Sequence, residues 1–314
     1  MSLLEPVATQ SPSLAASGSD QPFSFHAKDW LPYALLSLVL VVLYYRVAAK
    51  LVFDWYDIPD YSHGFLVPLF SLFLLWDKRE TLRATPIAQT WKGLLLVVPG
   101  ICVLILGIYG ADLFLSRTSL ILLLAGLVWT FAGRAMLSAV KFPLLALLLA
   151  IPFPAIVFSQ ITFPLQLLAT QLASGILPLF GVPVLHDGNV IQLPVMKLEV
   201  AEACSGIRSL MSLFTLAVFY GYFLEKKTSR RVFLALSSIP IAVAANAFRI
   251  VGTGLCVQFW DPDKALGFFH EFSGWVMFCV SLFLLYIVHR LMMLFTRAKS
   301  GPVPPAPAER AAAL

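Results

Sequence analysis

Residues 93–111 read GLLLVVPGICVLILGIYGA and contain no charged side chain. A helix that spans a bilayer needs about 20 consecutive, mostly apolar residues, so this stretch is long and apolar enough to cross a membrane. The rest of the chain repeats the pattern, because 59% of its 314 residues are hydrophobic and only 12% are charged. A soluble domain of this size could not cover that much apolar surface, so the composition predicts a membrane protein.

We predict an all-α polytopic membrane protein with about eight transmembrane helices. The predicted spans are residues 31–51, 61–77, 93–111, 117–134, 138–158, 205–224, 231–257 and 271–295. A further apolar stretch at 160–180 is interrupted by Pro164, Gly175 and Pro178. This stretch fits a re-entrant or interfacial helix, or a ninth span.

The basic residues of the short loops predict the orientation, because cytoplasmic loops carry an excess of Lys and Arg. Basic residues gather in loop 77–92, in loop 225–231 and after the last span. In loops 52–60 and 258–270, by contrast, most of the charged residues are Asp. Eight spans with both termini in the cytoplasm satisfy this distribution. Arg46 and Lys50 lie near the outer end of the first helix, against the rule, where their long stems could snorkel to the interface.

The chain is predicted to have three parts: a flexible polar leader (1–30), a transmembrane domain (31–296) and a disordered cytoplasmic tail (297–314). The leader has one basic residue, Lys28, which is poor for a signal peptide. The net charge of +5 lies mainly in short loops. It therefore favours topology marking over nucleic-acid binding.

Residues 181–203 read GVPVLHDGNVIQLPVMKLEVAEA, in which Val, Ile and Leu alternate with polar residues around HDGN. Asp, Gly and Asn suit the left-handed backbone of a tight turn. We expect a small extracytoplasmic β-hairpin before the sixth span, leading directly into Cys204.

Cys204 lies in AEACSGIRSL (201–210), at the predicted outer start of the sixth helix. A helix N-terminus favours the thiolate form of a cysteine, so this thiol is a candidate nucleophile. A small packing residue and a disulfide with Cys256 are the alternatives. Cys102 and Cys279 lie in the middle of predicted helices and are interpreted as buried packing residues.

Arg249 lies about two turns below the outer end of the seventh predicted span. An arginine within a span is costly unless it is paired or hydrated, which makes it a functional candidate. The alternative is an ion pair with Glu202 or Asp261 that holds helices together. Asn246 is three residues earlier on the same face, where it could orient the guanidinium or hydrogen-bond between helices.

The histidines differ in the side of the membrane on which they are predicted to lie. His270 begins the eighth span at the outer side and is the candidate acid–base residue, with His63, at the outer start of the second span, as its competitor. His186 is expected to be solvated in the hairpin, and His289, near the cytoplasmic side, is expected to have no role. Arg208 lies one turn below Cys204, where it could bind an acidic group of a substrate or form an interhelical pair.

Cys204, Arg249 and His270 make a coherent chemical set. A thiolate attacks an acyl carbon, a histidine passes a proton to a departing amine, and an arginine stabilises a thiolate or an oxyanion. Such a set suits the formation and resolution of a thioester. The chain has no HExxH, GxSxG or Walker motif, no CxxC pair and no metal-ligand spacing, so no metal or cofactor is expected.

Four segments, together with their order in the chain, resemble the exosortases, the integral-membrane sorting enzymes of bacteria that carry PEP-CTERM proteins. They are PDYSHGFLVPLFSLFLLW (59–76), VAEACSGIRSL (200–210), IPIAVAANAFRI (239–250) and HEFSGW (270–275). The resemblance covers roughly residues 30–295. It implies a catalytic triad of Cys204, Arg249 and His270.

The resemblance also implies a function: a cysteine protease or transpeptidase that recognises a C-terminal Pro-Glu-Pro signal on an exported protein, cleaves near it and transfers the protein to an acceptor. The implied location is the bacterial inner membrane, with the active site facing the periplasm and a link to exopolysaccharide export. Expected partners are PEP-CTERM cargo proteins, an unknown acceptor and membrane lipid, with no nucleic acid. The alternatives are a polytopic scaffold and an acyltransferase that acts on a lipid or glycan donor.

Overall fold

The structure is a computed structural model that describes residues 27–200, 206–260 and 268–299. The chain divides into two compact units, Met1–Tyr45 and Arg46–Leu314. Helix α1 (Ala27–Asp57) belongs to both units, and every feature below lies in the second.

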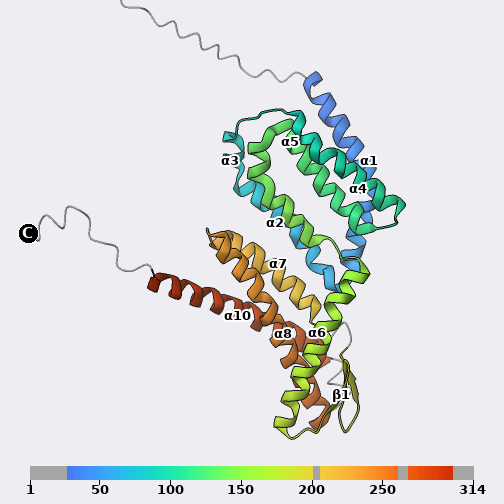
Figure 1. Cartoon of the computed structure of the whole chain (residues 1–314), viewed down its shortest axis with the longest axis vertical. Coiled ribbons are helices and arrows are strands. Elements are labelled where there is room, and N and C mark those ends of the chain that lie inside the picture. The colour runs from blue at the N-terminus through green and yellow to red at the C-terminus, as the bar shows by residue number, and fades with distance from the viewer. Residues whose placement is uncertain (1–26, 201–205, 261–267, 300–314) are drawn as a thin grey trace, which may run out of the picture. The chain divides into compact units, whose positions relative to one another are not determined.

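Helices make up most of the described chain (Figure 1). The first half contains η1 (Pro59–Phe65), α2 (Leu66–Asp77), α3 (Arg79–Ala84), η2 (Trp91–Gly93), α4 (Leu94–Tyr109), α5 (Leu113–Ala146) and η3 (Leu147–Ala150), where η denotes a 3-10 helix. The second half contains α6 (Ala155–Ile176), η4 (Leu177–Phe180), β1 (Leu185–Asp187), β2 (Val190–Gln192), β3 (Lys197–Glu199), α7 (Ile207–Leu224), α8 (Thr228–Phe259) and α10 (Phe268–Lys299).

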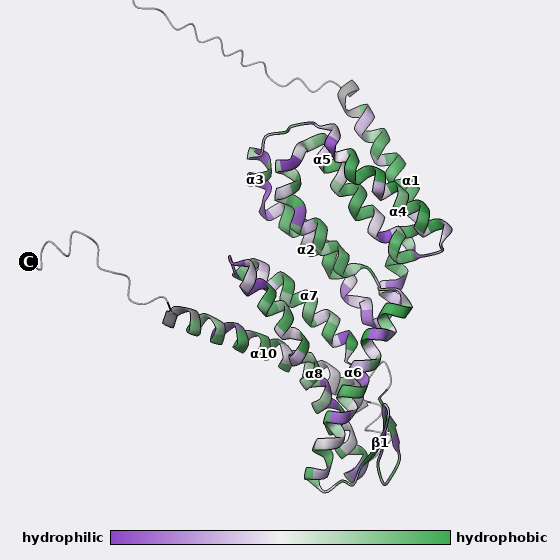
Figure 2. Ribbon diagram, viewed as in Figure 1, coloured by the Kyte–Doolittle hydropathy of each residue, from purple (hydrophilic) through white to green (hydrophobic). Residues whose placement is uncertain are grey.

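Seven helices of the described residues are long and apolar enough to cross a membrane. Their surfaces are predominantly hydrophobic, as Figure 2 shows by colour. The prediction of an all-α polytopic membrane fold is therefore confirmed. Helix α1 begins within the predicted leader and α10 extends to Lys299, into the predicted tail, whereas residues 1–26 and 300–314 lie outside the described ranges.

Glycines join α4 closely to the first half of α5. A Cβ atom added at Gly93 would lie 2.2 Å from the Thr130 hydroxyl oxygen, and one added at Gly107 would lie 2.5 Å from the Ser116 hydroxyl oxygen. Small residues let membrane helices approach with their backbones nearly touching, where dispersion forces are strongest. The apolar stretch 93–111 thus also carries the face that pairs it with its neighbour.

Helix α5 corrects the predicted boundary between two spans, 117–134 and 138–158. It runs from Leu113 to Ala146, but Gly133 has φ 90° and ψ 175°, which interrupts the helical backbone. Glycine adopts this positive φ without steric cost. The chain therefore makes two helical halves at a sharp break. In α5, 20 residues precede Gly133 and span about 30 Å, and 17 residues follow it to the end of η3 at Ala150.

Helix α6 corrects the expectation of a broken apolar stretch at 160–180. It is one continuous helix of 22 residues that contains Pro164 and ends in the 3-10 turn η4. Ile161 and Leu165 line an apolar groove with Ile239 of α8, whereas Leu177 packs against Gly254 of the same helix. Helix α6 therefore runs parallel to the second half of α8.

The predicted hairpin is confirmed and is part of a larger sheet. Strands β1 and β2 pair antiparallel, with Asp187 opposite Val190, and Gly188 in the turn has φ 58°. Strand β3 adds antiparallel to β2, giving the order β1-β2-β3. The side chains of Ile191 and Leu198 are buried with Leu177 of η4 and Val257 of α8 in one apolar cluster.

Basic residues from distant segments converge on Tyr222, near the end of α7. Lys78 lies 5.2 Å and Arg231 4.4 Å from the centre of the Tyr222 ring, and Phe142 of α5 stacks on that ring. Lys78 also donates a hydrogen bond to the carbonyl of Ala139. We call this the basic end of the molecule, because the predicted cytoplasmic loops meet there.

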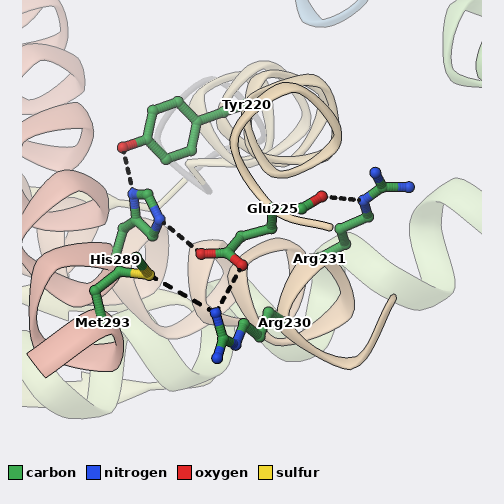
Figure 3. Close-up of polar contacts among 6 residues, drawn as sticks. All are labelled: Tyr220, Glu225, Arg230, Arg231, His289 and Met293. Atoms are coloured by element: carbon green, nitrogen blue, oxygen red, sulfur yellow. Dashed lines mark hydrogen bonds and ion pairs between the residues drawn. The ribbon is translucent and has the colours of Figure 1, made fainter. Parts of the chain in front are cut away.

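A polar cluster fastens α10 to the α7–α8 turn at the basic end (Figure 3). Glu225 is only 4% exposed, and its carboxylate lies 3.0 Å from Nε2 of His289 and 3.2 Å from Nη1 of Arg230. Nδ1 of His289 is 2.8 Å from the Tyr220 hydroxyl. His289 was dismissed only as a candidate for the chemistry, and in the structure it links two helices through a buried carboxylate.

A second group of contacts lies at the other end of α7, far from the basic end. We call this region the cavity end. Trp55 of α1 donates a hydrogen bond to the carbonyl of Ala150, and Nε2 of His63 lies 3.1 Å from the carbonyl oxygen of Leu149. Helix α7 connects the two ends with 18 residues. At about 1.5 Å per residue it spans about 27 Å, close to the hydrocarbon thickness of a bilayer.

Candidate active site

The start of α7 is built around Gly206, which is its N-cap residue with φ 72°. A Cβ atom at this position would lie 2.7 Å from Cγ of Asn246 in α8. Any other residue would therefore need both a strained backbone and a displaced Asn246. This glycine, two residues after Cys204 in the sequence, brings the start of α7 directly against α8.

Helix α8 presents Asn246 and Arg249 at the cavity end. Asn246 is 4% exposed, whereas Arg249 is half-buried and its main-chain carbonyl accepts a hydrogen bond from the Thr253 hydroxyl. A Cβ atom added at Gly274 of α10 would lie 3.3 Å from Cζ of Arg249. The absence of a side chain at Gly274 therefore lets the guanidinium lie against the backbone of α10.

These residues border a cavity of about 610 Å³ between η1, α7, α8 and α10. Its lining combines two arginines, an asparagine and several serines with a few apolar side chains: Ser62, Gly206, Arg208, Ser209, Ser212, Ala245, Asn246, Arg249, Gly274, Trp275, Met277, Phe278 and Ser281. The lining formed by the described residues contains no carboxylate. Its charge therefore favours an anionic or strongly polar ligand.

Arg208 forms an interhelical ion pair, one of the two roles considered for it. Its Nε atom lies 3.5 Å from a carboxylate oxygen of Asp60 in η1. The Arg208 side chain is 55% exposed, whereas that of Asp60 is 15% exposed. Arg208 lines the cavity, whereas Asp60 does not, and the exposed Arg208 side chain lies where a ligand can reach it.

His63 is close to the cavity in sequence but is held elsewhere. Its side chain is 6% exposed, and Nε2 is engaged with the carbonyl of Leu149. The adjacent Ser62 lines the cavity, whereas His63 does not. The geometry thus favours an anchoring role for His63 over the acid–base role for which it competed.

Two members of the predicted triad are located only through their neighbours. Cys204 lies outside the described residues, as do Glu202 and Asp261, the partners considered for Arg249. His270 belongs to the first turn of α10, four residues before Gly274.

The other cysteines differ in part from expectation. Cys102 and Cys279 are exposed on the helix surfaces, so the interpretation of both as buried packing residues is wrong. Cys256 is partly buried against the cluster of α6, α8 and the sheet. Its proposed disulfide with Cys204 involves a residue outside the described ranges.

Three residues of the cavity region were not predicted from the sequence: Gly206 and Gly274, which shape the cavity, and Asp60, which pairs with Arg208. A signal was present, because a Ser-Gly pair occurs in both CSGIR and FSGW, directly beside the candidate cysteine and one turn after the candidate histidine. A glycine within a helical segment often marks a close approach of another group.

The fold and the site define a polytopic helical membrane protein with a cation-lined polar cavity at one end of its helices. A family model described as transmembrane exosortase (Exosortase_EpsH) matches residues 55–287, about three quarters of the chain. The chain therefore belongs to the exosortase family, which implies an enzyme of the transpeptidase or protease type that acts on protein cargo. No curated protein and no solved structure gave a match.

Proposed function

We propose that this protein is a cysteine-dependent peptidase or transpeptidase. It cleaves a PEP-CTERM-type sorting signal at the C-terminus of exported proteins and transfers them to an acceptor. Family membership supports the class of enzyme, and the cavity supports the site. Cys204, Arg249 and His270 carry the chemistry, with Asn246 and Arg208 in support.

The observation that carries the proposal is the convergence of three helix segments on one cavity. Gly206 and Arg249 line it together with Gly274. The covalent chain keeps the Cα atoms of Cys204 and Gly206 within about 7 Å of each other, because they are two residues apart. His270 precedes Gly274 by one helical turn, so each of the three catalytic residues belongs to, or directly adjoins, a segment that forms the cavity.

The proposed membrane topology has eight crossings. They are formed by six of the seven long apolar helices, with α5 counted twice, and by η1 with α2, whereas α6, which is also long enough to cross, is placed elsewhere. The two halves of α5 count as two crossings, and η1 with α2 supplies 19 residues from Pro59 to Asp77 for another. Helix α6 begins beside the middle of α8 and continues beside its last turns, so we place it at and beyond the outer membrane surface. Both termini then lie in the cytoplasm, and the cavity opens at the periplasmic face of the inner membrane.

The first chemical step breaks the peptide bond of the signal. The Cys204 thiolate attacks the carbonyl carbon and forms a C–S bond, while the negative charge on the carbonyl oxygen is stabilised by the fixed guanidinium of Arg249. When the tetrahedral intermediate collapses, the C–N bond breaks and His270 donates a proton to the departing amine. The products are a thioester on Cys204 and the released C-terminal signal.

The second step resolves the thioester. His270, now neutral, accepts the proton of an acceptor amine or hydroxyl, or of water, as that group attacks the thioester carbon and releases the thiolate. Asn246 is buried against Gly206 and lies three residues from Arg249, where it helps to fix the guanidinium. The sheet precedes residues 201–205 directly and is suited to limit water entry, which would favour transfer over hydrolysis.

The test is cargo processing by Cys204→Ala in cells that co-express a cargo with a Pro-Glu-Pro signal. We expect normal membrane insertion and no processing, because the change removes only the nucleophile. Cys102→Ala is the matched control, since its thiol is exposed on α4, and it should process cargo normally. Full processing by Cys204→Ala would refute the thiol mechanism.

A further inference from the structure

The turn η1 is held rigidly at the cavity end by groups on both of its sides. The Tyr61 hydroxyl accepts a hydrogen bond from the main-chain N–H of Phe153, and the Tyr61 side chain is 3% exposed. A Cβ atom added at Gly64 would lie 2.3 Å from the Trp55 ring, so the turn packs tightly on α1. With His63 fixed at Leu149 of η3, η1 forms a platform whose position follows from α1, η3 and the segment directly after η3.

This platform presents Asp60 to the one cavity-lining arginine of α7. The contact runs from a carboxylate oxygen of Asp60 to Nε of Arg208, at 3.5 Å. A guanidinium has five N–H donors, of which Nε supplies one. An ion pair through Nε leaves the four donors of the two terminal nitrogens available, in the fork geometry that binds a carboxylate in a bidentate manner.

We propose that Asp60 is a positioning residue that orients Arg208 for recognition of a carboxylate on the cargo. The rigid partner is the short Asp60 side chain on η1, and the adjustable partner is the long, half-exposed Arg208. Without Asp60, Arg208 would have to lose much more conformational freedom when the cargo binds. This inference rests on the proposed function, because it concerns cargo recognition at the same cavity.

The pair is suited to orientation because it contributes little to stability. The Arg208 side chain is 55% exposed, and the 3.5 Å contact is longer than a strong charge-assisted hydrogen bond, so the net energy of the pair should be small although Asp60 is largely buried. Loss of the Asp60 charge should therefore leave the fold intact. Its effect should appear in the binding of cargo and not in the bond-breaking steps.

The experiment measures KM and kcat for purified, bilayer-reconstituted enzyme and a purified cargo with a Pro-Glu-Pro signal. We expect Asp60→Asn to raise KM by about threefold to tenfold with kcat nearly unchanged, in the range of a misplaced surface charge contact. Asp57→Asn is the matched control, because Asp57 is an exposed acidic residue three positions away, and it should leave both constants unchanged.

Two further comparisons separate positioning from a structural effect. Arg208→Ala and the double variant Asp60→Asn/Arg208→Ala should have the same KM if Asp60 influences cargo binding through Arg208. With a cargo whose signal Glu is replaced by Gln, Asp60→Asn should have no effect on KM. Additive effects of the two substitutions, or an unchanged KM for Asp60→Asn with the Glu cargo, would overturn the inference.

The same assay with Cys204→Ala distinguishes this inference from the proposed function. If Cys204→Ala is inactive and Asp60→Asn behaves as wild type, the positioning role of Asp60 is wrong and the thiol mechanism stands. If Cys204→Ala processes cargo, the proposed function fails, and the role of Asp60 fails with it.

Discussion

The basic end and the cavity end both place charged side chains within a helical membrane protein, but they use them differently. At the basic end, the Glu225 carboxylate contacts His289 and Arg230, and its main-chain carbonyl accepts a hydrogen bond from Arg231. At the cavity end, Arg208 and Arg249 border about 610 Å³ of open space. The Glu225 cluster is closed on itself, whereas Arg208 and Arg249 face room for a ligand. Elsewhere at the basic end, Lys78 and Arg231 border a smaller cavity of about 430 Å³, so the contrast concerns the Glu225 cluster and not the whole basic end.

The difference teaches how to distinguish a structural charge from a functional one in a membrane. A buried carboxylate with nearby cationic and hydrogen-bonding groups fixes helix positions, and removal of one partner leaves an uncompensated charge. Cations that line a cavity contribute less to the stability of the fold. Their removal should therefore reduce ligand binding or reaction before it reduces folding. Four predictions test this contrast.

The largest effect on processing is expected for Arg249. If it supplies a fixed, forked positive charge at the oxyanion, Arg249→Lys should lower processing by about 10²–10³-fold, nearly as far as Arg249→Ala. Membrane abundance should persist in both variants. Processing assays at matched enzyme abundance check this, and restoration of activity by lysine would reduce Arg249 to an interhelical charge.

His270 and His63 should differ in the kind of defect that they cause. His270→Ala should lower processing by about 10²-fold or more, because protonation of the leaving amine fails. His63→Ala removes the contact to Leu149 and should lower abundance or thermal stability while the remaining enzyme stays active. Inactive but abundant His63→Ala, together with active His270→Ala, would show that the acid–base role belongs to His63.

Glu225 should matter for stability and not for chemistry. Glu225→Ala removes the partner of His289 and Arg230, and the loss of one member of a buried pair typically costs about 3–5 kcal/mol. We expect reduced abundance and a lower thermal midpoint, with unchanged processing per folded molecule. Arg83→Ala, on an exposed side chain of α3 that pairs only loosely with Glu80 at 3.5 Å, is the control and should change neither.

The side of the membrane that each end faces can be tested by thiol labelling, without an activity assay. A cysteine introduced at Asp187, in the sheet, should react with a membrane-impermeant thiol reagent in cells whose outer membrane is permeabilised. A cysteine at Lys227, in the α7–α8 turn, should react only after the inner membrane is opened. The reverse pattern would place the cavity in the cytoplasm and contradict the exported-cargo proposal.

The sequence predicted the features that depend on local composition. Hydropathy located most of the helices, although the predicted span 138–158 crosses the non-helical residues 151–154. The HDGN turn located the hairpin, and the basic loops at Lys78 and Arg231 correctly indicated segments that meet at one end. The candidate residues Asn246, Arg208 and Arg249 do line one cavity. Each of these predictions needed only the periodicity or the chemistry of a short segment.

The features that the sequence did not predict depend on contacts between distant segments. The break in α5 falls at Gly133 because that backbone meets the carbonyl of Ala88, which no local pattern reveals. Pro164 lies within a continuous α6, since neighbouring groups in a membrane fold compensate for a proline. His289 and Asp60 acquired partners 64 and 148 positions away, on helices whose pairing only the fold decides.

The most direct test of the account is to identify the residue that carries cargo during turnover. Wild-type enzyme is mixed with cargo, quenched in acid and digested, and the peptide that contains Cys204 is analysed by mass spectrometry before and after treatment with hydroxylamine. We expect that peptide to carry the cleaved end of the cargo as a thioester, which hydroxylamine removes, and we expect no adduct in Arg249→Ala. Cargo attached to a different residue, or full processing by Cys204→Ala, would contradict the account.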